Sequence, residues 1–464
     1  MCNVSLNGTQ PTDASIRVLR ALEAAGLEAW YVGGWVRDAL MGRPSHDVDM
    51  CCSGLWQESK AALEAADIAV VESGIKFGGI TAICDGERIE VTTYRLDGFY
   101  TDGRHPQSVE RAASLEDDLA RRDFTVNAMA WHPERGLVDR YDGQGDLDRK
   151  LIRAVGDPKR RFNEDALRML RAVRFACRLD FMIEPATKQA LAECAPLLDA
   201  VARERVGIEL EGILSTGHGG DAMLRYPELI CAAVPELAAG RGFDQCSVYH
   251  AFNVYEHIAR VLTVAGELAL CDGVAPSSSL MWAAFLHDVS KPDCFTLDHA
   301  GSGHFYGHPE LGAKKARVIM DRLALSHDLV RDVCLLIKYH DKPLRPERSC
   351  LLNMMRALSG EGVDTPRLMD ELMDLKRADT LGKAPSCFYY VETIEEMRAL
   401  THELLAAGEP YTLKMLAING GDLIRAGVKP GPELGQLLNA ALDAVIEDNI
   451  PNDCEALLAH LHLG

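Results

Sequence analysis

The chain contains 464 residues, of which 47% are hydrophobic and 25% are charged, and its formal net charge is −20. This length and composition predict about two to four globular domains, and no uninterrupted apolar run is long enough to span a bilayer. The first residues lack the charged start and apolar block of a secretory signal, so the sequence predicts a cytoplasmic protein without a membrane partner.

The cysteines do not form a disulfide pattern. The chain has 14 of them, scattered singly through apolar stretches except for the adjacent pair Cys51 and Cys52. No two have the CxxC spacing of a zinc site. We therefore expect reduced thiols, as in proteins of a reducing compartment.

The first third of the chain mixes helical and strand patterns. Residues 15–26 predict a helix, 28–32 a strand, 35–42 a helix after a glycine pair, and 46–52 a second strand. Residues 78–95 predict a β-hairpin that turns at Asp85-Gly86, and a polar loop follows over 96–110. The head is therefore expected to be an α/β domain with a small mixed sheet.

Three acidic residues of this head have the spacing of a metal site. A strand places residues two apart on the same face, so Asp47 and Asp49 would present their carboxylates to one point. Glu90 alternates with apolar residues in the hairpin and would add a third. Carboxylates favour Mg²⁺, and such a set can hold two ions roughly 3.5–4 Å apart for phosphoryl or nucleotidyl transfer.

A glycine pair precedes these acids at a predicted strand-to-helix turn. Without side chains at Gly33 and Gly34, backbone N–H groups can approach a phosphate, and Arg37 lies about one turn into the following helix. Taken singly, a glycine pair or two spaced aspartates more often belong to a solvated turn. Their order and close spacing favour a triphosphate beside a metal site.

From about residue 150 onward the pattern is almost wholly helical, and it begins with a basic segment. Residues 149–178 contain ten Lys or Arg against three acids, in a chain that is acidic as a whole. Within the predicted helix 163–179, Asp165 and Arg168 are three residues apart and would be neighbours. A solvated ion network is the alternative to a phosphate- or nucleotide-binding surface here.

An aspartate beside an arginine can distinguish nucleobases without a template. Asp165 accepts hydrogen bonds and Arg168 donates them, which matches the amino group and ring acceptor of cytosine or adenine. Uracil and guanine present a carbonyl and a protonated nitrogen instead, which would leave buried groups unpaired at roughly 1–3 kcal/mol each. The pair therefore predicts selection of C and A.

Four segments together resemble a known family. "VGGWVRDALMGRPSHDVDM" (32–50), "RRDFTVNAMAW" (121–131), "RFNEDALRMLRAVRF" (161–175) and "RERVGIEL" (203–210) are similar to the class II tRNA nucleotidyltransferase / poly(A) polymerase family. The resemblance implies a polymerase β-like head followed by helical neck, body and tail regions. It implies that Asp47, Asp49 and Glu90 are the catalytic, metal-binding acids. The positions it implies for the nucleotide are Gly34, Arg37, Arg122, Asp165, Arg168, Arg171 and Arg174.

The loop between the hairpin and residue 121 also has a counterpart in that family, where it helps to switch from C to A addition. Asp102 and Arg104 are the candidates for this role. The alternative is that a glycine-rich polar loop is only a flexible connection.

Histidines further along the chain form a second pattern. Their order with two aspartates resembles the HD phosphohydrolase superfamily, which implies one metal bound by His257, His287, Asp288 and Asp379. Imidazole and carboxylate ligands suit a divalent transition metal. His308 and His340 would permit a second ion, whereas any single histidine on an apolar helix is more often part of the core.

The sequence thus predicts an α/β head followed by all-α regions: a nucleotidyltransferase head (12–150), a helical neck and body (151–240), an HD region (241–390) and a helical tail (391–464). The predicted activity is Mg²⁺-dependent addition of CCA to the 3′ end of tRNA from CTP and ATP, with no DNA partner. Alternatives are a poly(A) polymerase or a partial CC- or A-adding enzyme, an HD phosphohydrolase with a nucleotide-binding head, and a non-catalytic RNA-binding protein. The sequence indicates no oligomeric state.

Overall fold

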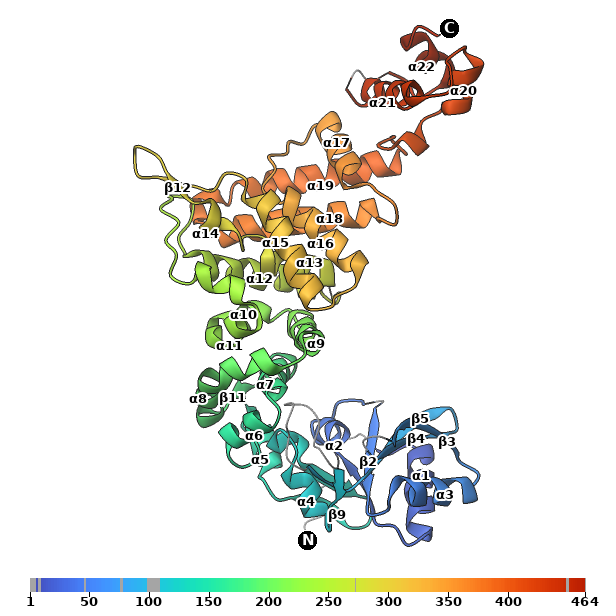
Figure 1. The fold of residues 1–464 in the computed structure, drawn as a ribbon, viewed down its shortest axis with the longest axis vertical. Coiled ribbons are helices and arrows are strands. Elements are labelled where there is room, and N and C mark those ends of the chain that lie inside the picture. The colour runs from blue at the N-terminus through green and yellow to red at the C-terminus, as the bar shows by residue number, and fades with distance from the viewer. Residues whose placement is uncertain are drawn as a thin grey trace. The chain divides into compact units, whose positions relative to one another are not determined.

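The computed structural model describes residues 6, 10–45, 47–75, 78–97, 109–271, 273–447 and 450–463. The chain divides into two compact units (Figure 1). The first comprises the residues up to Ile213 together with Tyr226–Ala233, and the second comprises Leu214–Arg225 and the residues from Val234 onward. The predicted candidates Asp102 and Arg104 lie outside the described residues.

The first unit is built on a mixed sheet. In its described part, seven strands pair in the order β3-β4-β5-β2-β1-β8-β9, with β2 and β5 parallel and the other neighbours antiparallel. The strands are β1 (Ala29–Val32), β2 (Val48–Cys52), β3 (Ala69–Gly74), β4 (Gly79–Cys84), β5 (Glu87–Thr93), β8 (Met129–His132) and β9 (Gly136–Asp139). A short separate pair joins β6 (Arg95–Asp97) and β7 (Val109–Arg111).

Helices α1 (Asp13–Ala24) and α3 (Trp56–Ala65) pack together against β4 and β5, on one face of this sheet. The alternation in β5 explains which face they cover, because Ile89 and Val91 are buried while Arg88 and Glu90 are exposed. The predicted hairpin is confirmed. β4 and β5 pair through Cys84 and Glu87, and Asp85 and Gly86 have positive φ angles of 51° and 84°, as a two-residue hairpin turn requires.

Helices continue the first unit after the sheet. They are α2 (Gly34–Leu40), α4 (Leu115–Ala120), α5 (Gly143–Asp148), α6 (Pro158–Glu164), α7 (Leu167–Leu179), α8 (Pro185–Cys194), α9 (Arg203–Leu214) and α11 (Pro227–Ala233), and a short parallel pair joins β10 (Leu151–Ile152) to β11 (Met182–Ile183). Short 3₁₀ helices lie at Thr125–Asn127 and Ala195–Ala200.

The single helix predicted over 163–179 is wrong. Helix α6 ends at Glu164, Asp165 has an extended backbone with φ −144° and ψ 105°, and α7 begins at Leu167. The side chain of Asp165 accepts the N–H of Leu167 at 3.0 Å. An aspartate that satisfies a backbone donor in this way favours a helix start over a helix interior, and this explains the break.

The second unit is helical. Its helices are α10 (Gly219–Arg225), α12 (Val254–Cys271), α13 (Ser278–Leu286), α14 (Lys291–Cys294), α15 (His308–Arg322), α16 (His327–Tyr339), α17 (Arg348–Leu358), α18 (Thr365–Gly382), α19 (Tyr390–Ala406), α20 (Gly420–Arg425), α21 (Pro432–Glu447) and α22 (Cys454–His460), with a small pair β12 (Thr296–Leu297) and β13 (Gly303–His304). Three further 3₁₀ turns lie at Pro235–Gly240, Pro385–Cys387 and Leu413–Met415.

Helix α13 is the centre of this unit. It is buried from Ser279 to Leu286 and packs against α12, α16 and α18, as expected for a helix that is apolar on every side. His287 and Asp288 follow its last turn, so they are fixed inside the bundle. Within the described residues, no helix combines the length and the apolar character that a bilayer span requires.

Candidate functional site

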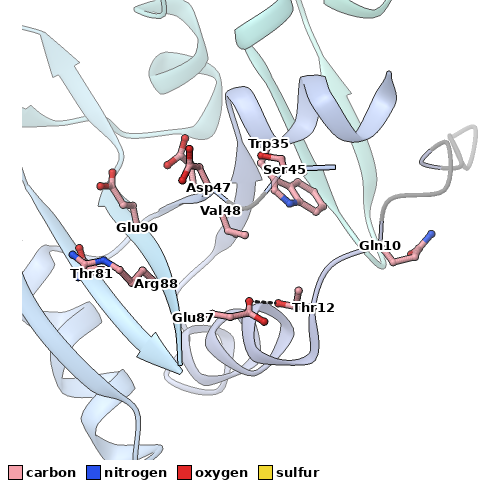
Figure 2. A pocket seen from close by; sticks show the side chains of 11 residues that line it. Gln10, Thr12, Trp35, Ser45, Asp47, Val48, Thr81, Glu87, Arg88 and Glu90 are labelled. Atoms are coloured by element: carbon pink, nitrogen blue, oxygen red, sulfur yellow. Dashed lines mark hydrogen bonds between the residues drawn. The ribbon is translucent and has the colours of Figure 1, made fainter. Parts of the chain in front are cut away.

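The three predicted acids of the head lie on one face of the sheet. Asp49 on β2 and Glu90 on β5 are register partners in the parallel pair, and Asp47 directly precedes β2. All three line a pocket of about 780 Å³. Figure 2 shows the carboxylates of Asp47 and Glu90 directed to the same side of the strands. The sequence prediction that these residues converge is borne out by the geometry.

Asp49 is the most enclosed of the three acids. Burial and the negative charge of Glu90 raise its pKa to about 6, although Arg122 acts in the opposite direction. Within the described part of the chain, no hydrogen bond or ion pair involves the side chain of Asp49 or Glu90. Neighbouring carboxylates without a cation are unfavourable, and a divalent ion with oxygen ligands would neutralise them. The residues therefore fit a Mg²⁺-type site.

The glycine turn borders this acidic face. Gly33 has φ 69° and ψ −134°, a conformation that favours glycine. A Cβ atom at this position would lie 3.0 Å from Nη1 of Arg122 and 3.6 Å from Oδ2 of Asp49. Its own N–H donates to the carbonyl of Met129 at 3.4 Å. The absence of a side chain at Gly33 thus lets Arg122 approach Asp49.

Arg37 is held next to the turn by its own partners. Its side chain is buried, with a relative exposure of 4%, and it donates to both carboxylate oxygens of Asp38 at 2.9 Å and to Oδ1 of Asn127 at 2.7 Å. Its guanidinium lies 5.4 Å from the ring centre of Phe175, and those of Arg171 and Arg174 lie 5.3 and 5.0 Å from the same ring. The structure thus brings three of the predicted arginines around one aromatic ring.

Four predicted nucleotide-binding residues line a second, basic pocket of about 290 Å³. They are Arg122, Asp165, Arg168 and Arg171. The remaining lining residues are Arg95, Arg121, Asp123, Leu167 and Arg205. Six arginines face two aspartates there, and this balance suits an anion such as a nucleotide phosphate. The predicted residues Gly34, Arg37 and Arg174 do not line this pocket.

Asp165 and Arg168 are neighbours as predicted, but on either side of the break between α6 and α7. Arg205 on α9 donates to Oδ2 of Asp165 at 3.2 Å. Arg168 is largely buried, at 8% exposure, and it donates to Glu164 at 2.9 Å and to the carbonyl of Arg121 at 3.1 Å. Both side chains are therefore held at the pocket wall by protein partners.

Arg171 and Arg174 are oriented by acids that sequence reasoning did not identify. Arg171 donates to Oδ2 of Asp123 from Nε and Nη2, at 3.0 and 2.8 Å. Arg174 donates to Glu209 at 2.6 Å. Asp123 and Glu209 belong to the quoted segments 121–131 and 203–210, so the signal was present, but the pairing depends on the tertiary fold.

Arg122 also has an anchor that the sequence did not indicate. Asp118 is fully buried and accepts hydrogen bonds from Arg121 at 2.7 Å and from Arg122 at 3.0 Å. Burial alone would raise the pKa of Asp118, but Arg122 and Arg121 hold it below its ordinary value. This charged anchor fixes Arg122 between the basic pocket and the acidic face.

The second unit contains a buried cluster of the predicted histidines and aspartates. Nε2 of His257 lies 3.1 Å from Asp379 and 3.3 Å from Asp288, and Nε2 of His287 lies 3.2 Å from Asp288. On the other oxygen of Asp288, Nε2 of His308 and of His340 lie at 3.4 and 3.7 Å. Asp288 thus stands between two groups of potential ligands.

The second ring nitrogens of these histidines face backbone carbonyls, which favours a proton on Nδ1. Nδ1 lies within hydrogen-bond distance of a backbone carbonyl in each: Gly382 for His257 (3.2 Å), Ala284 for His287 (2.9 Å), Phe305 for His308 (2.8 Å) and Ile337 for His340 (2.7 Å). With the proton on Nδ1, each Nε2 directs a lone pair at the carboxylates. The Nε2 atoms converge on the carboxylates of Asp288 and Asp379, with which Lys291 and Lys383 also pair. This set of ring nitrogens and carboxylate oxygens fits a metal.

Comparison with known proteins places these sites in a family. Family models match residues 29–153 (poly A polymerase head domain), 180–239 (RNA and SrmB-binding site of polymerase A), 254–383 (HD domain) and 385–461 (tRNA nucleotidyltransferase domain 2). The CCA-adding enzyme of Leuconostoc mesenteroides subsp. mesenteroides is 32% identical over 445 residues, which cover 95% of this chain and 93% of the relative.

The chain belongs to the CCA-adding enzyme family. The CCA-adding enzyme of Streptococcus thermophilus is also 32% identical, over 450 residues that cover 96% of this chain and 95% of the relative. Among solved structures, the Bacillus stearothermophilus CCA-adding enzyme in complex with CTP is 26% identical, with a TM-score of 0.71 and 98% of each chain covered.

Membership of the CCA-adding enzyme family confirms the main predictions from the sequence. These are the family itself, the α/β head followed by helical regions, and the nucleotidyltransferase activity on the 3′ end of tRNA. The HD domain is confirmed as a domain. The four domain boundaries and the roles of individual residues stay predictions.

Proposed function

We propose that this CCA-adding enzyme adds C, C and A to tRNA at the face formed by Asp47, Asp49 and Glu90. The observation that carries the proposal is the register pairing of Asp49 with Glu90 beside the Gly33 turn and Arg122. In this proposal the RNA 3′-hydroxyl attacks the α-phosphorus of CTP or ATP, a new P–O bond forms, and the bond to pyrophosphate breaks. Asp47, Asp49 and Glu90 would hold Mg²⁺, which when bound supplies charge stabilisation at the attacking and leaving oxygens.

The basic side of the site would bind the triphosphate. Arg122 lies beside the acidic face, since its Nη1 lies near Gly33 and its charge acts on Asp49. The first turn of α2 follows, with Gly34 and then the tightly held Arg37. Arg171 and Arg174 extend the positive charge along α7. Positive charge fixed in advance stabilises the charge that develops during phosphoryl transfer without further reorganisation.

Asp165 and Arg168 would read the base of the incoming nucleotide. Each carboxylate oxygen of Asp165 has one protein donor, Leu167 N–H or Arg205. A carboxylate has about four acceptor positions, so capacity remains for the amino group of cytosine or adenine. Arg168 donates to Glu164 and to the carbonyls of Arg121 and Arg161, and these contacts hold its guanidinium beside Asp165. The protein would thus take the place of a template.

One assay tests this function against its nearest alternatives. tRNAs that end before the first C, before the second C and before the A are each incubated with single labelled triphosphates. We expect C, C and then A to be added, and neither U nor G. Addition of A alone to varied RNAs would instead indicate a poly(A) polymerase, and arrest after CC or addition of A only would indicate a partial enzyme.

The HD domain supports a second proposed activity, hydrolysis of phosphate esters. The specific observation is Asp288 between the two histidine pairs, with Asp379 completing the first group. Lys291 lies 2.7 Å from Asp288 and Lys383 lies 2.5 Å from Asp379, so cations are available for a phosphate. A divalent transition metal suits these ligands. Metal analysis together with hydrolysis of bis(p-nitrophenyl) phosphate tests this activity separately from CCA addition.

We also propose that the enzyme works in the cytoplasm. In the described part of the chain, every cysteine is a free thiol, and proteins of a reducing compartment keep their cysteines in this state. Fractionation of the native cells with an antibody against the chain would test the location. Recovery from a membrane or an extracellular fraction would contradict it.

A further inference from the structure

Arg88 lies on the acidic face of the head, next to the proposed catalytic carboxylates. It precedes Glu90 by two residues on β5, so both project from the exposed face while Ile89 turns into the core. Arg88 lines the same pocket as Asp47 and Asp49 (Figure 2). Val48 and Ile89 are partners in the parallel pair. The residues that precede them, Asp47 and Arg88, therefore lie opposite each other.

Arg88 is the only cation that lines this pocket in the described part of the chain, among the acids Asp47, Asp49, Glu87 and Glu90. Within the same residues, no hydrogen bond or ion pair is formed by its exposed guanidinium. Many other arginines of the head are paired with carboxylates, as in Arg17 with Asp85, Arg20 with Glu134, Arg37 with Asp38, Arg122 with Asp118 and Arg140 with Glu116. A free cation on an acidic surface is available for an anion that must approach it.

The strand order separates Arg88 from the proposed triphosphate site. Gly33 follows β1, whereas Arg88 and Glu90 belong to β5, and β2 with Asp49 lies between these two strands. In phosphoryl transfer the attacking and leaving oxygens lie roughly in line. If the triphosphate lies on the β1 side, the RNA 3′-hydroxyl must approach from the β5 side.

We infer that Arg88 binds the phosphodiester that precedes the 3′-terminal nucleotide of the RNA. This inference rests on the proposed function of the acidic face. Two residues along a strand span roughly 6.6 Å, so Arg88 lies about one nucleotide away from Glu90. A terminal nucleotide with its 3′-hydroxyl at the acids would place its 5′ phosphate beside Arg88. Arg88 is therefore an RNA-binding residue that positions the nucleophile.

The test combines Arg88→Ala with a neutral linkage in the RNA. The substrate is a tRNA that lacks only the final A, prepared with either a normal phosphodiester or an uncharged methylphosphonate before its 3′-terminal nucleotide. With the normal RNA, we expect Arg88→Ala to raise the KM for RNA about tenfold, the loss of one charge-assisted contact, and to leave the KM for ATP unchanged. With the methylphosphonate RNA, the wild-type and Arg88→Ala enzymes should have the same KM.

Two matched variants complete the experiment. Arg88→Lys keeps the charge and should restore most of the RNA affinity, and Arg17→Ala removes an exposed arginine of α1 that pairs with Asp85 and should change neither KM. Loss of one phosphate contact should also reduce the salt dependence of RNA binding by about one counterion. Thermal melting of each variant verifies that it is folded.

Two results would overturn the inference while CCA addition itself remains intact. One is an equal penalty from the methylphosphonate in the wild-type and Arg88→Ala enzymes. The other is a rise in the KM for ATP in place of the KM for RNA, which would assign Arg88 to the triphosphate. If the wild-type enzyme added neither C nor A, the proposed function itself would fail, and this inference would fail with it.

Discussion

Asp49 and Glu90 lie opposite each other on the parallel strands β2 and β5, with no ion pair to either side chain among the described residues. Two acids in this position depend on an external cation for compensation. This arrangement leads to two predictions, one for catalysis and one for stability.

Replacement of the central carboxylate should abolish nucleotide addition. In Asp49→Asn, an oxygen ligand with a charge becomes a neutral amide of nearly the same size. We expect incorporation of labelled CMP and AMP to fall at least about 1000-fold, since removal of a single transition-state contact already costs about 100- to 1000-fold. The far-UV circular dichroism spectrum should not change. Turnover near the wild-type rate would contradict the assignment of Asp49 to the metal.

The same substitution should stabilise the metal-free protein, and the effect should depend on pH. The folded-state pKa of Asp49 is about 6, compared with an ordinary value of 3.8. A carboxyl group with a raised pKa favours the folded state below the ordinary value, and this contribution is lost as the pH rises through 6. In EDTA at pH 7.5, the free energy of unfolding of Asp49→Asn should therefore be about 1–3 kcal/mol higher than that of the wild type.

At lower pH this advantage of the amide should disappear. At pH 4, Asp49 is protonated in the folded protein and, with its ordinary pKa of 3.8, about half protonated in the unfolded protein. Most of the difference between the two free energies of unfolding should therefore be lost. Urea denaturation in EDTA at pH 4 and at pH 7.5 measures both values, provided that each protein remains folded at pH 4. An equal difference at the two pH values would mean that Asp49 has an ordinary pKa.

The two glycines of the turn should respond differently to the same substitution. Gly33 has a positive φ, and a methyl group there would lie 3.0 Å from Arg122. We expect Gly33→Ala to reduce the free energy of unfolding by about 1–3 kcal/mol and to raise the KM for CTP and ATP. Gly34→Ala is the matched control for stability, since its Cβ would meet Arg37 at 3.5 Å, an ordinary contact. Equal destabilisation by both would exclude the close approach of Arg122 as the cause.

Nucleotide selection should depend on Asp165. Asp165→Ala removes the acceptor for the amino group of cytosine and adenine, so discrimination between CTP and UTP should fall by about 10- to 100-fold, the effect of roughly 1–3 kcal/mol. The measurement is kcat/KM for each of the four triphosphates. Arg178→Ala, at the exposed end of α7, should leave the discrimination unchanged. Retained selectivity in Asp165→Ala would show that another group reads the base.

The two units should be separable by mutation. His257→Ala and His308→Ala each remove one ligand from a different side of Asp288, so each should lower the metal content of the purified protein and abolish any hydrolysis of bis(p-nitrophenyl) phosphate. CCA addition should persist in both variants. His327→Ala, an exposed histidine at the start of α16, serves as the control. Unchanged metal content in both cluster variants would contradict the metal assignment.

Much of the head could be predicted because its signals are local. The turn at Asp85-Gly86 and the alternation in β5 follow from residues adjacent in sequence, and they fix the face on which Glu90 lies. The parallel register of β2 against β5 depends on pairing distant segments, and the sequence predicted only that Glu90 would join Asp47 and Asp49.

The break at Asp165 could not be predicted by the same reasoning. The helical period continues through it, and only the side-chain bond of Asp165 to Leu167 N–H and its contact with Arg205 show why the chain departs from a helix. The anchors Asp118 and Asp123 were also missed. Their partners were identified as nucleotide-binding residues, but a buried ion pair depends on a three-dimensional arrangement that the linear sequence does not contain.

A change at Asp288 alone would affect the histidine and aspartate cluster of the second unit and leave the first unit intact. Because its two oxygens face separate histidine pairs, replacing this one residue would dismantle both halves of the cluster together. The acids Asp47, Asp49 and Glu90 of the head precede Asp288 by 198 positions or more and take no part in the cluster. A single base change could therefore remove the proposed hydrolytic activity of the HD domain in one lineage, leaving it a purely architectural role, while repair of transfer RNA ends continued unaltered.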